Sequence, residues 1–212
     1  KELFVQADNL RVVGRAGVGV DNIDLESATL RGVVVMNTPT GNTNAAAEHT
    51  VTLMLAAARR VAPAYKSLQN GKWEREKFIG RELRDKTLGI IGLGRIGQEV
   101  AVRARSFDME CIGYDPFLSQ DKFGTLDITP VELDDLIRTA DVITVHVPRN
   151  ENTLNMISDD EIAAMKDGVI LINCARGGIY NEEAVARGLS PVRWAPPGST
   201  YSSTSRSGTI PF

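Results

Sequence analysis

A glycine-rich turn between a short apolar run and an amphipathic helix constrains this chain more than any other feature. In TLGIIGLGRIGQEV, residues 87–100, three glycines follow a predicted strand with the spacing G-x-G-x-x-G. Gly92 makes the tight turn, Gly94 lets a pyrophosphate approach the backbone, and Gly97 lets the helix pack near the strand. The sequence therefore predicts a dinucleotide-binding site at this turn.

The helix after the turn completes the predicted phosphate site. Its first backbone N–H groups, including that of Ile96, have no partner within the helix and would face the phosphates. The side chain of Arg95 either contacts the cofactor or is a solvated residue at the helix start. Asp115 ends the next predicted strand about twenty residues on, where a carboxylate can accept both ribose hydroxyls of NAD and repel the 2′-phosphate of NADP. We therefore expect NAD, against the alternative of a glycine turn without a ligand.

Short apolar runs alternate with helical patterns along most of the chain, which is typical of a parallel sheet with crossover helices. Their length and β-branched content favour buried strands over buried helices. We predict strands within residues 10–16, 32–37, 87–93, 110–115, 141–147 and 168–175. The fold class is therefore α/β, with a Rossmann-type doubly wound parallel sheet.

Several residues mark where the predicted helices begin and end. An Ala-rich helix over residues 42–69 has a capping residue within 42–44, a kink near Pro63 and a stop at Asn70-Gly71. Ser158 and Glu161 have the spacing of a capping box.

One further helix start is predicted from a proline. Thr129-Pro130 is expected to begin a helix through residues 131–140, because proline fits the first turn of a helix and acidic residues follow it closely.

The organisation along the chain suggests three segments. Residues 1–38 are too few to close a core of their own, and we interpret them as part of a substrate domain. Residues 39–187 form the NAD-binding domain, which we expect to be incomplete. Residues 188–212 contain no acidic residue and are rich in Ser, Thr, Pro and Gly, so we expect an irregular tail that is aberrant or disordered. The absence of an initiator Met leads us to expect that the chain begins inside a larger protein.

Composition excludes several classes of function. The net charge of -3 gives no electrostatic reason to expect a nucleic acid or an anionic membrane as partner. The two cysteines suit reduced thiols in the cytoplasm, and His49 and His146 are too few and too isolated for a metal site. No apolar run has the length of a membrane span. The expected partner is a small molecule.

With these residues identified, the chain resembles the D-isomer-specific 2-hydroxyacid dehydrogenases. The segments GRAGVGVDNID, MNTPTGNTNAAAEHT, NGKWEREKFIGRELRDKTLGIIGLGRIG, GYDP and NCARGG occur in the order of that family, from about Asn9 to about Ala186. The resemblance implies a two-domain NAD-dependent oxidoreductase acting on CH-OH donors, with its active site in the cleft and a flavodoxin-like substrate domain before the Rossmann domain. It is strongest to members that act on a phosphorylated three-carbon hydroxy acid in serine biosynthesis. It also implies a homodimer formed through the helix of residues 42–69.

The resemblance assigns roles to residues at two strand ends. Arg176 of NCARGG would be catalytic, gripping the substrate carboxylate and also bordering the cofactor; its planar fork matches a carboxylate, although a surface arginine after a strand is the alternative. Cys174 and Ala175 would line the nicotinamide pocket, with Cys174 as a small apolar filler rather than a nucleophile. Val147 and Pro148 would border the nicotinamide ribose.

The loop after the first strand would face the substrate from the other domain. Backbone N–H groups of Val18 and Gly19 would hold its carboxylate, and Arg15 would help with a phosphate or with domain closure. We expect Asp21 and Asn22 to fix this turn through local hydrogen bonds rather than to touch substrate.

Neither histidine matches the catalytic base of the family, which lies in a later segment. We interpret His146 as a structural or cofactor-wall residue, and His49 as a packed or interdomain residue. Family members continue after NCARGG with L-D-V-[FY]-x-x-E-P and then the catalytic histidine, and neither occurs here. The catalytic His and its Glu partner are therefore missing, and we expect little or no turnover from this chain.

The tail permits a different interpretation in a shifted reading frame. Codons for GSTYSSTSRSGTIPF, read from the third base, allow LDVFLDEPLGDNPL, which is the expected continuation. We hypothesise a single-base slip in or near residues 186–197; a genuine low-complexity linker is the alternative. Two functional alternatives also stay open, a non-catalytic NAD-binding module and a dehydrogenase of glyoxylate or hydroxypyruvate.

Overall fold

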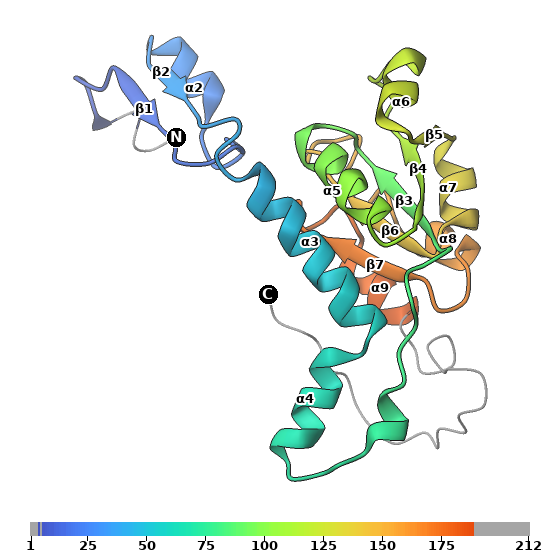
Figure 1. The fold of residues 1–212 in the computed structure, drawn as a ribbon. Coiled ribbons are helices and arrows are strands. Elements are labelled where there is room, and N and C mark those ends of the chain that lie inside the picture. The colour runs from blue at the N-terminus through green and yellow to red at the C-terminus, as the bar shows by residue number, and fades with distance from the viewer. Residues whose placement is uncertain (1–3, 5, 189–212) are drawn as a thin grey trace.

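The structure is a computed structural model that describes residue 4 and residues 6–188 of the chain. It contains a two-stranded and a five-stranded parallel sheet, connected by helices (Figure 1). The predicted tail, residues 188–212, therefore lies outside the described residues except for Gly188. The hypothesis of a shifted reading frame concerns residues 186–197, of which only residues 186–188 are described.

The N-terminal unit is a small parallel βαβ arrangement. β1 (Val12–Gly14) pairs in parallel with β2 (Val34–Met36), and α2 (Leu25–Leu30) connects them. Asp24 caps α2, because its carboxylate accepts a hydrogen bond of 2.8 Å from the backbone N–H of Ser27. The buried core of this N-terminal unit consists of Phe4, Ala28 and Val33. The two predicted strands are confirmed, whereas the flavodoxin-like origin of this unit stays a prediction.

The main sheet has five parallel strands in the order β5-β4-β3-β6-β7. Its strands are β3 (Thr87–Ile91), β4 (Glu110–Tyr114), β5 (Thr129–Pro130), β6 (Val142–Val145) and β7 (Ile170–Asn173). All four strands predicted for this sheet are confirmed. β3 and β6 are almost wholly buried, which explains their continuous apolar sequences, since a sheet covered on both faces has no polar side.

Helices cover both faces of this sheet, as the doubly wound prediction requires (Figure 1). One face packs against α3 (Thr43–Ala58) and α5 (Arg95–Arg105), and α6 (Gln120–Leu126) adds Phe123 to the same core. The other face packs against α7 (Leu133–Thr139), α8 (Asp159–Ala164) and α9 (Glu182–Gly188). The α/β fold class is therefore confirmed.

The predicted helix of residues 42–69 is two helices rather than one kinked helix. α3 ends at Ala58 and α4 (Val61–Gln69) begins after Arg60, which has a left-handed φ of 54°. Pro63 explains the break: it has no N–H to donate to the carbonyl of Arg59, and its ring would clash with that carbonyl. The predicted stop is confirmed, with Asn70 as the C-cap of α4.

The prediction that Thr129-Pro130 begins a helix is wrong. These residues form the edge strand β5, in register with Ile112 and Gly113 of β4, and α7 begins at Leu133. An edge strand tolerates proline because one of its sides makes no ladder hydrogen bonds. The capping box of Ser158 and Glu161 is confirmed at the start of α8.

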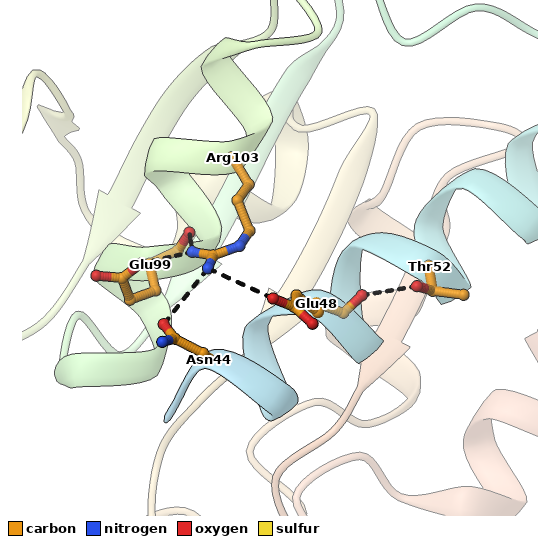
Figure 2. Close-up of polar contacts among 5 residues, drawn as sticks. All are labelled: Asn44, Glu48, Thr52, Glu99 and Arg103. Atoms are coloured by element: carbon orange, nitrogen blue, oxygen red, sulfur yellow. Dashed lines mark hydrogen bonds and ion pairs between the residues drawn. The ribbon is translucent and has the colours of Figure 1, made fainter. Parts of the chain in front are cut away.

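A polar cluster joins α3 to α5 (Figure 2). The guanidinium of Arg103 on α5 pairs with Glu99 one turn earlier, and it reaches Asn44 at 3.4 Å and Glu48 at 4.0 Å on α3. The cluster therefore attaches the first turns of α3 to the helix that follows the glycine-rich turn.

After α4 the chain forms a short 3-10 helix, η1 (Arg75–Phe78), before it enters the main sheet. No helix in residues 6–188 is long and apolar enough to cross a membrane.

Candidate dinucleotide and substrate site

The predicted glycine-rich turn lies at the carboxyl end of β3, between that strand and α5. Gly92 has a φ of +90°, which favours glycine, and its N–H donates to the carbonyl of Tyr114 on β4 at 2.9 Å. A β-carbon on Gly97 would overlap the carbonyl oxygen of Gly92, whereas a β-carbon on Gly94 would meet nothing within 4 Å. The turn is therefore tightly packed at its two ends and open at its middle glycine.

The first turn of α5 presents backbone donors at this open position. Gly94 is the N-cap and has no side chain, and the first i to i−4 hydrogen bond runs from Gln98 N–H to the Gly94 carbonyl at 3.1 Å. The N–H groups of Arg95, Ile96 and Gly97 precede that bond and have no partner within the helix. Such donors, together with the helix dipole, suit an anionic phosphate.

Asp115 lies at the end of β4, and hydrogen bonds fix both of its carboxylate oxygens. Oδ2 accepts from the backbone N–H of Leu93 at 2.8 Å, and Oδ1 accepts from that of Phe117 at 2.9 Å. A carboxylate oxygen accepts more than one hydrogen bond, so each retains capacity for a ribose hydroxyl. The structure thus brings Asp115 to the glycine-rich turn, and its contact with a ribose stays a prediction.

The end of β6 borders the same turn. β3 lies between β4 and β6, so successive strands are added on opposite sides of β3 at this point of the sheet. A β-carbon on Gly92 would lie 2.8 Å from Cγ1 of Val147, and Pro148 follows in the loop. Burial lowers the pKa of His146 to about 4, and its Nε2 lies 3.0 Å from the hydroxyl of Thr144. A neutral, hydrogen-bonded imidazole suits a wall of the site, and the contacts of Val147 and Pro148 with a nicotinamide ribose stay a prediction.

The end of β7 is shaped by Asn173. Its side chain accepts from the N–H of Ala175 at 3.0 Å and donates to the carbonyl of Arg176 at 2.8 Å, which fixes the turn that carries Arg176. Burial raises the pKa of the Cys174 thiol, opposed in part by a hydrogen bond with Thr50. The raised pKa keeps the thiol protonated, and the role of Cys174 as a filler rather than a nucleophile stays a prediction.

Arg176 reaches across to the loop of the N-terminal unit. Its Nε and Nη2 donate to Oδ1 of Asp21 at 3.0 and 2.8 Å, and its Nη1 donates to the carbonyl of Ala175 at 2.8 Å. The hydrogen bond from Arg176, and then one from its own backbone, lowers the pKa of Asp21. We predicted local hydrogen bonds for Asp21; its main partner is instead Arg176, because the opposite charge attracts its exposed carboxylate.

The loop of residues 15–21 presents the predicted substrate groups beside this ion pair. Within the described part of the chain, no hydrogen bond from the backbone N–H of Val18 or Gly19 is found. A β-carbon on Gly19 would overlap the guanidinium of Arg176, so the two residues lie in direct contact. Arg15 instead folds back over Gly17, whose β-carbon would lie 2.6 Å from its Nη1.

Two further candidate residues, Arg95 and His49, are both exposed. Arg95 lies at the start of α5, where its guanidinium is 3.4 Å from the carbonyl of Pro39 in the segment between the two units. His49 is exposed on α3, which does not fit the packed residue that the sequence suggested, whereas the alternative of an interdomain residue stays a prediction. Residues 6–188 contain no cluster of three His, Cys, Asp or Glu side chains that could hold a metal ion.

The sequence interpretation missed two residues that shape the site. Asn173 directs Arg176, and the side chain of Asn37 donates to the carbonyl of Val18 at 2.7 Å, which fixes the substrate loop. Both lie at the carboxyl ends of predicted strands. A polar amide at such a position is a usable signal, because ligands of α/β folds bind at that edge.

Residues 51–195 match the family described as D-isomer specific 2-hydroxyacid dehydrogenase, NAD binding domain. The chain is 52% identical over 184 residues to a D-3-phosphoglycerate dehydrogenase of Archaeoglobus fulgidus and 50% identical over 183 residues to that of Homo sapiens. These matches cover 87% and 86% of this chain but 35% and 34% of the relatives. The chain thus spans about a third of the length of the curated relatives it matches.

Solved structures of a D-lactate dehydrogenase and a glyoxylate reductase have a similar fold. D-lactate dehydrogenase from Aquifex aeolicus, in a complex with NAD and lactic acid, has a TM-score of 0.83 and 32% identity, covering 92% of this chain and 58% of its own. A glyoxylate reductase from Paecilomyes thermophila has a TM-score of 0.83 and 33% identity, covering 91% and 58%.

Proposed function

Because the chain belongs to the D-isomer specific 2-hydroxyacid dehydrogenases, whose NAD-binding domain it contains, we propose that it binds NAD at residues 92–97 and Asp115. We propose further that Arg176 receives the carboxylate of a D-2-hydroxy acid or the corresponding 2-oxo acid. In this arrangement the chain provides the cofactor side of an oxidoreductase that acts on CH-OH groups.

One observation carries the cofactor proposal: the turn is closed at Gly92 and Gly97 and open at Gly94. The unpaired N–H groups of α5 begin at that opening, and the Asp115 carboxylate is fixed at its edge by Leu93. A pyrophosphate next to Gly94 and a ribose next to Asp115 would fill this arrangement with complementary charge and hydrogen bonds.

The substrate proposal rests on a second group of residues. Arg176 offers a planar cationic fork, and Val18 and Gly19 offer backbone N–H groups without partners in the described residues. Bound NAD would accept a hydride from the substrate carbon, and the chain's own residues bind and orient the acid beside it. The neutral thiol of Cys174 adds no negative charge that would repel an anion.

D-3-phosphoglycerate is the substrate we propose, because relatives named D-3-phosphoglycerate dehydrogenase are about half identical to this chain. Glyoxylate or hydroxypyruvate is the alternative, and the likeness to a glyoxylate reductase structure favours it more weakly, at 33% identity. Comparing the affinities of the NADH-loaded chain for D-3-phosphoglycerate and glyoxylate decides between these acids.

Titration with NADH, followed by the fluorescence of the nicotinamide, tests the cofactor site. Asp115→Asn should weaken NADH binding by about tenfold or more, because a hydrogen bond to a charged group contributes about 1.5–3 kcal/mol. It should also narrow the preference for NADH over NADPH. Asp121→Asn on exposed α6 is the matched control and should leave both affinities unchanged. Wild-type chain that shows no saturable NADH binding would rule the proposal out.

Turnover by the 212-residue chain is a separate question. We propose that it is small, because we assign neither His49 nor His146 to proton transfer, and these are the two histidines of the sequence. Purified chain with NAD and D-3-phosphoglycerate should form little NADH. Binding without turnover would agree equally with a non-catalytic NAD-binding module, whereas rapid NADH formation would show that other groups move the proton.

We propose that the chain forms a homodimer through the region of residues 42–69 and acts in the cytoplasm. α4 exposes Val61, Tyr65 and Leu68 and lies away from the five-stranded sheet in Figure 1. Cys111 and Cys174 are both free thiols, which suits a reducing compartment.

A further inference from the structure

The contact between Asp21 and Arg176 joins two segments that are 155 residues apart in sequence. Asp21 lies in the loop that follows β1, and Arg176 lies in the turn that follows β7. Both side chains are partly exposed, at 53% and 38% of their surface. An exposed pair of this kind contributes little to stability, so its effect is better sought in the orientation of Arg176.

The hydrogen bonds of Arg176 leave a defined set of donors. A guanidinium has one N–H on Nε and two on each terminal nitrogen. Asp21 uses the Nε hydrogen and one hydrogen of Nη2, and Ala175 uses one hydrogen of Nη1. One hydrogen therefore remains on Nη1 and one on Nη2, and both are free to donate to a carboxylate.

The surroundings support a fixed orientation for this fork. Gly19 lies against the guanidinium so closely that any side chain there would displace it. Asn173 holds the carbonyl of Arg176, so the backbone of the residue is fixed as well. The N–H groups of Val18 and Gly19, which make no hydrogen bond within the described residues, belong to the same loop as Asp21, and Gly19 itself contacts the guanidinium.

We propose that Asp21 is a positioning residue, which holds one edge of the Arg176 guanidinium so that the two remaining N–H groups receive the substrate carboxylate. This inference rests on the function proposed above. An arginine that is already ordered binds its ligand without first losing side-chain freedom, and that saving corresponds to about a two- to tenfold gain in affinity.

A competing effect has the opposite sign and makes the inference testable. Asp21 carries a negative charge near the site of an anionic ligand, so its removal would strengthen binding if charge repulsion outweighed orientation. Asp21→Asn separates the two effects, because the amide oxygen can still accept from Arg176 although the charge is gone.

Calorimetric titration of the NADH-loaded 212-residue chain with D-3-phosphoglycerate, and separately with D-glycerate, provides the first test. Asp21→Ala should raise the dissociation constant of both acids by about two- to tenfold, because both carry the carboxylate. Asp21→Asn should bind both acids nearly as tightly as the wild type. Asn22→Ala alters the same turn without touching Arg176 and should leave the affinities unchanged. The affinity for NADH should be the same in all four proteins.

The Nε–H resonance of Arg176 in ¹⁵N-edited NMR spectra provides a second measurement that needs no ligand. Arg176→Lys identifies the resonance by removing it. In the wild type this proton should exchange slowly with water because it is hydrogen-bonded, and Asp21→Ala should make it exchange faster or shift it.

Several results would overturn the inference. Equal or tighter binding of both acids by Asp21→Ala would do so, as would an equal loss in Asn22→Ala or an unchanged Nε–H resonance. Wild-type chain that binds NADH but neither acid would refute the role of the fork while leaving the cofactor proposal intact. Failure to bind NADH would instead refute the proposed function, and the positioning role with it.

Discussion

Gly97 packs against the carbonyl oxygen of Gly92, whereas the space beside Gly94 between them is open. The glycines of one turn therefore differ in what they do. Gly92 and Gly97 are required by the packing of the chain itself, and Gly94 borders empty space that a ligand would need.

Substituting these glycines separates folding from cofactor binding. Gly97→Ala should lower the free energy of unfolding by about 1–3 kcal/mol, because its methyl group must displace the Gly92 carbonyl. Gly94→Ala should lower that free energy by about 1 kcal/mol or less, because a β-carbon there meets nothing within 4 Å and the remaining cost is that alanine is a poorer N-cap than glycine. It should nevertheless weaken NADH binding by about tenfold or more, because the methyl group occupies the place of the pyrophosphate. Urea unfolding and NADH titration measure the two effects; equal behaviour of the two variants would contradict this division.

His146 should make stability depend on pH in a defined window. Burial lowers its pKa from 6.5 to about 4, so between these values the unfolded chain binds more protons than the folded one. The contribution of His146 is complete above pH 6.5 and is lost as the pH falls towards 4, by up to about 3 kcal/mol. The free energies of unfolding of the wild type and of His146→Gln, plotted against pH over this range, should differ in slope by the equivalent of up to one bound proton. An NMR titration that gives His146 a pKa near 6.5 would contradict the expectation.

Arg103 should contribute more to stability than an exposed arginine does. Its side chain is only 27% exposed and contacts Glu99, Asn44 and Glu48, which connect α5 to α3 (Figure 2). Arg103→Ala should therefore cost about 1–2 kcal/mol of unfolding free energy, from lost charged hydrogen bonds and packing.

Arg84→Ala is the matched control for this measurement. The side chain of Arg84 is 69% exposed, and its ion pairs with acidic residues are 3.8 and 3.9 Å long. Its removal should change stability by less than about 0.5 kcal/mol. A cost for Arg103→Ala as small as that of Arg84→Ala would show that the cluster is only a surface contact.

The sequence predicted the parallel sheet and the cofactor turn well because each depends on local patterns. Continuous apolar runs identified β3 and β6, and glycine spacing placed Gly92, Gly94 and Gly97 correctly in the turn. Asp115 could be connected to that turn because strand ends of a parallel sheet meet at one edge.

The errors arose where a distant contact decided the outcome. Thr129-Pro130 has the pattern of a helix start, yet pairing with β4 makes it an edge strand. Asp21 resembles a turn residue, and only the folded chain brings it to Arg176. The break at Arg60 lies about one turn before Pro63 because the proline affects the carbonyl that precedes it.

The apolar surface of α4 should mediate association of two chains. Tyr65 and Leu68 are 61% and 55% exposed, and Trp73 beyond the helix is 79% exposed, which would be costly for a surface facing water. Replacing Tyr65 and Leu68 together by Glu should convert a dimer into a monomer in light-scattering measurements, because two buried carboxylates without partners are strongly disfavoured. Leu30→Glu on α2 replaces another exposed leucine, 81% exposed, and should leave the dimer intact. A wild-type chain that is monomeric at all concentrations would place the interface elsewhere or exclude it.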